Sequence, residues 1–341
     1  MAGRLSRKQL SIVVGAAVAA VALVAGVSLA VVNGAQASTA AGGPGASTGA
    51  IASGAQGSQH ASDASSITWI DGGRVDAAVA ALQASGFHPV SPGKLTVAVS
   101  PLSPPLAFIP EGSNDPAGFD VNLAKLVAQA LGLEYAPVAV SWADWPLGVQ
   151  SGKYDAVISN VAITPERLQT YDFTSYRSAL HGFYVKADSA VATIAKPEDA
   201  AGLRVIVGSG TNQENILLRW NEILASQGLA PIELRYYDDQ SAAQLAIQSG
   251  RADALFGPNE SYSWQAAHGA AIRNAGVIPG RWPDSVEVGV TTAKGGGLAE
   301  PVRVAVQALI DDGTYGRLLD VWALGDSGIA TARVNPTTAE H

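Results

Sequence analysis

The sequence contains no cysteine and a single methionine in 341 residues. Without cysteine the chain can form neither a disulfide nor a Cys-based zinc site, and it has no catalytic thiol and no N-terminal cysteine that could carry a lipid. The five histidines are scattered, and neither a nucleophile elbow nor a phosphate-binding glycine loop is present. We therefore expect no catalytic residue, no metal site and no cofactor.

Charge is also scarce, and positive charge is the scarcer sign. Charged residues make up 15% of the chain, with 21 basic against 29 acidic side chains and a net charge of −8. An acidic surface repels phosphate backbones, which argues against nucleic acid as a partner. Hydrophobic residues reach 48%, enough for two packed lobes in a chain of this length.

The first 37 residues have the features of an export signal. Three basic residues lie within the first eight positions, residues 11–32 carry no charge, and residues 35–37 read Ala-Gln-Ala. This order is typical of a signal peptide with a small-residue cleavage site. The apolar run would span about 33 Å as a helix and could instead be retained as a membrane anchor. Both alternatives place the rest of the chain outside the cytoplasm, periplasmic or at the cell surface.

The next two stretches connect this segment to the main fold. In residues 38–66, 21 of 29 positions are Ala, Gly or Ser, a composition that predicts a flexible tether. Residues 67–93 carry one helical pattern and are expected to pack beside the main fold as an N-terminal extension. The main fold is predicted to begin at Lys94.

From Lys94 onward, strand and helix patterns alternate. A β-rich run, LTVAV at 95–99, is followed by a helix face with apolar residues at positions 119, 123, 127 and 131. Asp120 sits near the start of that helix, where an acid suits the helix dipole. Alternation of this kind predicts an α/β fold with mainly parallel sheets.

An internal repeat suggests two lobes of similar construction. VQSGKYDAV at 149–157 recurs as IQSGRADAL at 247–255, and each copy reads as a helix end, a glycine turn and a buried strand. A glycine followed by aspartate is also common in any turn from helix to strand, so this simpler reading stays open. Two such lobes would leave a cleft between the carboxyl ends of their strands, where open α/β sheets bind ligands.

Seven segments carry a resemblance to a known family. They are GFDVNL at 118–123, QSGKYDA at 150–156, ITPER at 163–167, YDFT at 171–174, GSGT at 208–211, SGRADA at 249–254 and DGTY at 312–315. In order and spacing, the region from Lys94 to Trp322 resembles the family 3 extracellular solute-binding proteins, which serve amino-acid importers of the ABC type. The resemblance implies a periplasmic-binding-protein type 2 fold with two α/β lobes and two hinge strands that close on ligand.

By this resemblance, lobe 1 comprises residues 94–186 and 288–325, lobe 2 comprises residues 187–287, and residues 326–341 form a C-terminal tail. The chain is expected to cross between the lobes near Val185 and to return near Val288. The ligand-binding residues that the resemblance implies are Trp142, Ser159, Asn160, Ala162, Arg167, Gly208, Thr211, Asn212 and Asn259.

Three of these residue sets have a plain physical role. The resemblance assigns a ligand carboxylate to Arg167, whose planar fork can give two parallel hydrogen bonds. Trp142 offers apolar area and an aromatic face, although ordinary core packing remains an alternative. Residues 208–212 precede a predicted helix whose first amide groups attract an anion. Either Thr211 or Asn212 could also simply cap that helix.

The sequence departs from the family pattern at the ammonium partner. The acid that usually pairs with the ligand's α-ammonium is replaced by Gly257 and Pro258. Asn259 or Glu260 could take over that role, or could belong to a surface loop.

Three functions remain in view. The first is the substrate-binding component of an ABC importer. Such a protein is expected to be a monomer that binds an amino-acid-like carboxylate and delivers it to a membrane permease. The second is an enzyme resembling cyclohexadienyl dehydratase, for which Glu260 is the one candidate proton donor. The third is a ligand-responsive partner of a membrane sensor.

Overall fold

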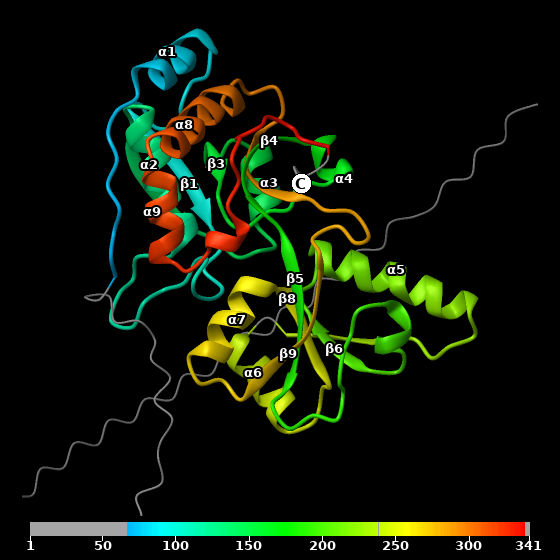
Figure 1. The fold of residues 1–341 in the computed structure, drawn as a ribbon. Helices are drawn as coiled ribbons and strands as arrows, with labels where there is room; N and C mark the ends of the chain where they lie inside the picture. Colours follow the sequence, from blue (N-terminus) through cyan, green and yellow to red (C-terminus); the bar gives the residue numbers. More distant parts are fainter. Residues whose placement is uncertain (1–66, 238, 338–341) are drawn as a thin grey trace, which may run out of the picture. The chain divides into compact units, whose positions relative to one another are not determined.

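The computed structural model describes residues 67–237 and 239–337. The predicted export signal, the apolar run at 11–32 and the tether at 38–66 lie outside these residues. Within the described part, no helix is both long and apolar enough to cross a membrane. The described chain forms two five-stranded sheets, each with its own hydrophobic core (Figure 1).

The sheet of lobe 1 has the strand order β2-β1-β3-β10-β4. Strand β1 pairs in parallel with β2 and β3, whereas β10 runs antiparallel to β3 and β4. Helices pack around this sheet, and α1 lies beside α8 (Figure 1). The strands of lobe 1 are β1 (Lys94–Val99), β2 (Glu134–Ala139), β3 (Ala156–Val157), β4 (Tyr171–Ser178) and β10 (Glu287–Ala293). Its helices are α1 (Asp76–Ala84), α2 (Phe119–Ala130), α3 (Trp145–Gln150), α4 (Pro165–Leu168), α8 (Ala299–Asp311), α9 (Thr314–Val321) and the 3-10 turn η3 (Gly325–Ser327).

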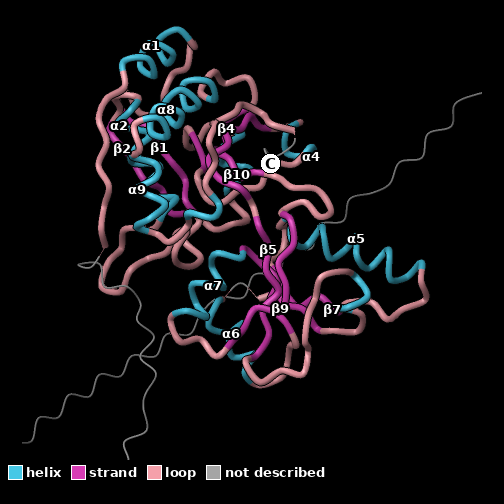
Figure 2. Tube along the Cα trace, in the orientation of Figure 1, coloured by secondary structure: helices cyan, strands magenta, loops and turns pink. Residues whose placement is uncertain are grey.

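The sheet of lobe 2 repeats this plan with the order β7-β6-β8-β5-β9. Strand β6 pairs in parallel with β7 and β8, and β5 runs antiparallel between β8 and β9. Strands β5 and β9 lie side by side in Figure 2. Its core contains an aromatic stack in which Phe183 lies 4.1 Å from Phe256 and 5.4 Å from Trp220. The strands are β5 (Leu180–Lys186), β6 (Arg204–Val207), β7 (Glu233–Tyr236), β8 (Ala254–Pro258) and β9 (Ile272–Pro279). The helices are η2 (Pro197–Ala200), α5 (Asn212–Ser226), α6 (Gln240–Gln248) and α7 (Asn259–Ala267).

The two copies of the sequence repeat occupy equivalent places in the two sheets. Each glycine turn has a positive φ, 68° at Gly152 and 72° at Gly250, a region that glycine adopts readily. The aspartate after each turn accepts a backbone N–H at the start of the neighbouring strand. Asp155 binds the Thr96 amide at 2.7 Å, and Asp253 binds the Arg204 amide at 2.8 Å. The repeat therefore marks the same turn in two sheets of the same construction.

The chain passes between the sheets earlier than expected. Strand β4 ends at Ser178 in the first sheet and β5 begins at Leu180 in the second, so the crossing is at Ala179 rather than near Val185. The expected lobe 1 boundary at 186 is corrected accordingly, because residues 180–186 pair with β8 and β9. The return passes through residues 280–286, between β9 and β10.

Both ends of the described chain pack on lobe 1. The amide of Ile70 donates to Asn122 Oδ1 at 2.9 Å, and the amide of Val75 donates to the Ala130 carbonyl, which attaches the extension to α2. The residues beyond 326 are more than a tail, since Val334 forms a bridge with Thr174 and Asn335 binds the Phe173 backbone in β4.

A glycine in β9 allows a close backbone approach, and its replacement is expected to destabilise lobe 2. A Cβ at Gly276 would lie 2.0 Å from the carbonyl oxygen of Ile194. We expect Gly276→Ala to lower the free energy of unfolding by about 1–3 kcal/mol, as overpacking does. Gly316→Ala in α9 is the matched control, because nothing lies within 4 Å of its Cβ position. Urea denaturation of both variants measures the difference, and equal stability would contradict the packing of the two segments.

Candidate functional site

A cavity of about 1150 Å³ lies between the carboxyl ends of the parallel strands of the two sheets. In lobe 1 it is lined by the loops that follow β1, β2 and β3. In lobe 2 it is lined by the loops that follow β6, β7 and β8. This is the edge at which open α/β sheets bind small ligands.

Eight of the nine residues expected to bind ligand line this cavity. They are Trp142, Ser159, Asn160, Ala162, Arg167, Gly208, Thr211 and Asn212. Asn259 does not, which corrects its placement: it begins α7, its Oδ1 accepts the Tyr184 hydroxyl at 3.0 Å, and it lines a separate cavity of about 230 Å³ instead. The cavity wall at this point is formed instead by Gly257 and Pro258.

Arg167 presents a cation to the cavity without an ion pair to any described residue. It lies on α4, which starts at Pro165 after the N-cap Thr164. Its Nη1 donates to the carbonyl of Ala162 at 3.0 Å, and burial lowers the pKa of the guanidinium to about 10. It therefore stays charged at neutral pH. The two acids that could have neutralised it do not, because Asp172 pairs with Lys294 and Glu166 forms no ion pair among the described residues.

Two tryptophans form an aromatic wall beside this cation. The rings of Trp142 and Trp145 meet edge to face at 5.9 Å, and the Arg167 guanidinium carbon lies 5.9 Å and 5.7 Å from their respective centres. Trp145 is buried in the lobe 1 core, whereas Trp142 is half-buried and faces the cavity. The pair flanks the guanidinium at cation–π distance, and all three residues line the cavity.

The loop after β3 is held rigidly. Ser159 Oγ accepts the Ser100 amide at 3.0 Å, so this hydroxyl joins the ends of β1 and β3. Asn160 has a φ of 52°, its amide donates to the Tyr176 hydroxyl at 3.0 Å, and its Oδ1 accepts from Arg177. A non-glycine residue in this conformation is uncommon and persists only where its surroundings fix it.

The start of α5 faces the cavity from lobe 2. Thr211 is the N-cap, with its hydroxyl accepting the Glu214 amide at 3.1 Å. The Gly210 amide is already taken by the Glu214 carboxylate at 2.6 Å. The Asn212 side chain turns inward to the Gly280 carbonyl and His181. What the helix offers a ligand is therefore its first backbone amides, which have no partner within a helix.

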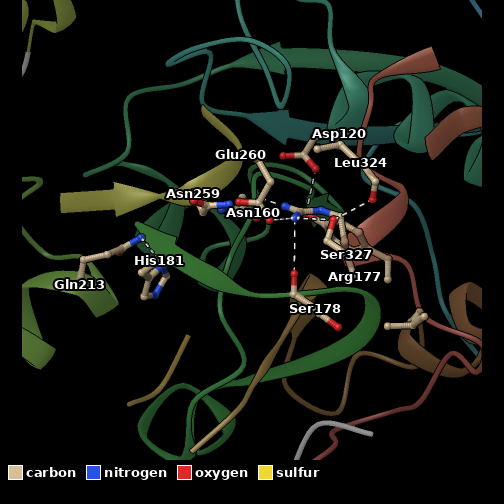
Figure 3. A network of polar contacts seen from close by, with 12 residues as sticks. Asp120, Asn160, Arg177, Ser178, His181, Gln213, Asn259, Glu260, Leu324 and Ser327 are labelled. Atoms are coloured by element: carbon tan, nitrogen blue, oxygen red, sulfur yellow. Dashed lines mark hydrogen bonds and ion pairs between the residues drawn. The ribbon is translucent and has the colours of Figure 1, made fainter. Parts of the chain in front are cut away.

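His181 was not expected in the site, yet it lines the cavity at 3% exposure. Burial lowers its pKa to about 4, so the ring is neutral at physiological pH. Its Nε2 lies 3.0 Å from the Gly280 carbonyl, and Nδ1 lies 3.2 Å from Gln213 Nε2 (Figure 3). The ring is thereby a fixed part of the wall and joins β5 to the start of α5.

A buried polar network reaches the cavity wall through Asp120 and Asn160, and Figure 3 shows it around Arg177. Arg177 of β4 is fully buried and pairs with Glu260 of α7 at 2.5 Å. It also donates to Asn160 and, at 3.2 Å, to Ser327. The buried Tyr176 hydroxyl donates to Asp120 Oδ1 at 2.9 Å. We call Asp120, Asn160, Tyr176, Arg177, Glu260 and Ser327 the buried network.

Among the described residues, no group of three or more His, Cys, Asp or Glu side chains is placed to hold a metal ion. Glu260, the one candidate proton donor, is bound to Arg177 and does not line the cavity. Asp120 and His181 line the cavity although neither was expected to bind ligand. Asp120 belongs to the family segment at 118–123, but an acid in the first turn of a helix is already explained by the helix dipole, so no further role was assigned to it.

The geometry agrees with comparison to known proteins. Residues 95–325 match the model of the bacterial extracellular solute-binding proteins, family 3. The chain belongs to this family. It is a solute-binding protein with the two-lobed α/β architecture of that family, and the family's proteins act outside the cytoplasm.

Its named relatives include binding proteins for amino acids. The arginine-binding protein ArgT of Corynebacterium glutamicum is 28% identical over 246 residues, covering 71% of this chain and 78% of that protein. The ABC transporter arginine-binding protein 1 of Escherichia coli K12 is 27% identical over 250 residues, covering 72% and 97%. Among solved structures, the ancestral amino acid-binding protein AncCDT-1, described as a precursor of cyclohexadienyl dehydratase, aligns with a TM-score of 0.58 at 27% identity, covering 67% of this chain and 95% of that one.

Proposed function

We propose that this solute-binding protein captures an amino acid, or a molecule like one, outside the cytoplasm and delivers it to the permease of an ABC importer. The observation that carries the proposal is the unpaired Arg167 cation on the cavity wall, opposite the start of α5. Each supplies hydrogen bonds for a carboxylate, and each belongs to a different lobe. A single carboxylate bound by both would favour closure of the lobes.

The cavity has room for the lobes to close around a small ligand. At about 1150 Å³ the cavity exceeds the upper end of the range usual for small-molecule pockets, which is about 1,000 Å³. Closure by rotation at the two crossings, at Ala179 and within residues 280–286, would reduce it around a small ligand. Two connections between the lobes can act as a hinge, and hinge closure suits a protein that captures and releases a ligand.

The enzyme alternative gains no support from the site. Elimination chemistry requires an acid placed to transfer a proton in the cleft. Glu260 is committed to Arg177, and His181 is held neutral with both ring nitrogens in contact with polar groups. The residues that line the cavity are therefore better explained by ligand binding than by catalysis.

The remaining parts of the proposal concern placement in the cell. We propose that residues 1–37 direct export and that residues 38–66 serve as a spacer between the membrane and the lobes, whether or not the apolar run is retained. The acidic net charge of −8 and the two-lobed plan suit a monomer that meets its permease transiently.

A thermal-shift panel of amino acids tests the proposed function. The protein is unfolded and refolded first to remove any ligand carried through purification. We expect at least one amino acid, with arginine, glutamine and cystine tested first, to stabilise the folded state by about 2.7 kcal/mol at a concentration of 100 Kd. The matching amino-acid amides, which lack the carboxylate, should fail to stabilise it. If no carboxylate-bearing compound raises the melting temperature, the proposed function is wrong.

A further inference from the structure

Asp120 is the one buried acid on the cavity wall whose charge is not fully balanced. It lines the cavity at 1% exposure, close to Leu106, whose carbonyl accepts the Asp120 amide. Its Oδ1 accepts the Tyr176 hydroxyl, while Oδ2 has no hydrogen-bond partner among the described residues. A buried carboxylate oxygen left without a donor is costly and calls for a partner that arrives from elsewhere.

The charges of the buried network do not sum to zero. Two carboxylates, Asp120 and Glu260, face a single guanidinium, and Arg177 makes its ion pair with Glu260. Burial raises the pKa of Asp120 to about 6 and the nearby Glu260 carboxylate adds to the rise, whereas Arg177, the Tyr176 hydroxyl and the backbone amide of Asn160 oppose it. At neutral pH Asp120 is therefore mostly ionised, and the network carries one excess negative charge behind the cavity wall.

No acid stands at the position where the family resemblance implies a partner for the ligand's ammonium group. Gly257 and Pro258 line the cavity where the family resemblance implies an acid. Among the described residues, the one other acid on the wall is Asp239, which is exposed and caps α6 by accepting the Ala242 amide at 2.7 Å. Asp239 is thus already used and solvated, whereas Asp120 Oδ2 is neither.

We propose that Asp120 Oδ2 is the binding partner of the ligand's α-ammonium group, in place of the acid missing at Gly257 and Pro258. This inference rests on the proposed function, because it assumes a ligand with both a carboxylate and an ammonium. Arg167 and Asp120 then provide opposite charges from one lobe, which selects a zwitterion over a simple carboxylic acid. The ammonium supplies the missing positive charge and the missing donor at once.

The test compares L-arginine with 5-guanidinopentanoate, which is arginine without its α-ammonium. We expect the parent protein to bind L-arginine at least tenfold more tightly by titration calorimetry. Asp120→Asn should abolish most of this preference while the affinity for 5-guanidinopentanoate stays within about twofold, since that ligand does not use the carboxylate. The same comparison with L-glutamine and its desamino analogue checks that the side-chain guanidinium is not the group being recognised.

The competing acid is tested by Asp239→Asn, which removes a charge from the same cavity and keeps a residue that caps helices well. If this variant, rather than Asp120→Asn, loses the preference for L-arginine, the assignment to Asp120 is wrong. Retention of the full preference by Asp120→Asn also overturns it. A parent protein that binds neither ligand pair, nor any amino acid in the panel, would instead show that the proposed function itself has failed.

The parent protein offers a second measurement should Asp120→Asn not fold. The titratable and charged groups that face Asp120 are Tyr176 and Arg177 from β4 and Glu260 from α7. Burial raises the pKa of Tyr176, and Glu260 raises that of Arg177 against the effect of burial, so neither of these two changes charge near pH 6. Between pH 7.5 and pH 5 the affinity for L-arginine should fall about tenfold, as protonation removes the Asp120 charge, while that for 5-guanidinopentanoate stays within about twofold. Equal pH dependence of the two ligands would contradict the proposal.

Discussion

Replacing Arg167 with alanine should weaken binding of the cognate amino acid by about 2–5 kcal/mol, the range for truncating one partner of a buried charge pair. The reason is that Arg167 forms no ion pair with any described residue, so its charge is available to the ligand carboxylate. Titration calorimetry with the amino acid found in the thermal-shift panel measures the change. Arg167→Lys keeps the charge but loses the planar fork, and its effect should be smaller.

Arg219→Ala is the matched control for this experiment. Arg219 also lies over a tryptophan ring, 5.8 Å from the centre of Trp282, but it is exposed and does not line the cavity. Its replacement should leave binding unchanged. If Arg167→Ala binds as tightly as Arg219→Ala, then Arg167 is not the carboxylate anchor.

The largest effect on stability is expected at the other buried arginine. Arg177→Ala removes a fully buried guanidinium and leaves the carboxylates of Glu260 and Asp120 without their nearest positive charge. We expect the free energy of unfolding to fall by about 3–5 kcal/mol, as for other buried pairs broken on one side. Urea denaturation at pH 7.5 measures this loss.

The exposed pair between Arg303 and Glu300 gives the comparison. These side chains also form an ion pair at 2.6 Å, but on the surface of α8. Arg303→Ala should change the free energy of unfolding by no more than about 1 kcal/mol, because surface pairs contribute little. The double variant Arg177→Met with Glu260→Gln should recover part of the loss, since it removes both charges. A loss at Arg177→Ala no larger than at Arg303→Ala would contradict the burial of the network.

The sequence was sufficient for features that arise locally. The helix face from Phe119 to Leu131 and the paired glycine turns at Gly152 and Gly250 follow from residue spacing and turn chemistry, and each is found where it was expected. Seven of the eight residues on the cavity wall follow the parallel strands β2, β3 and β6, and the eighth, Arg167, lies on α4. Because the ends of such strands meet at one edge of a sheet, their convergence could be foreseen.

Features that depend on distant pairing could not be foreseen. Arg177 and Glu260 are separated by 83 positions, and no sequence motif links the two residues. Strands β4 and β5 are both largely buried, and Ala179 is the single residue between them. The β-rich pattern therefore continues across Ala179, and the sequence gives no local sign that the chain changes lobe there. Asp120 looked fully explained as a first-turn acid, and its place on the cavity wall follows only once the loops after β1 and β3 are arranged around it.

Crystallography of the protein with its stabilising amino acid tests the central claim most directly. We expect the ligand between the two lobes, with its carboxylate on the Arg167 guanidinium and the first amides of α5, and its α-ammonium on Asp120. The lobes should have rotated toward each other about Ala179 and residues 280–286. A ligand bound elsewhere, or one in the cavity whose carboxylate points away from Arg167 while the lobes stay apart, would contradict the account.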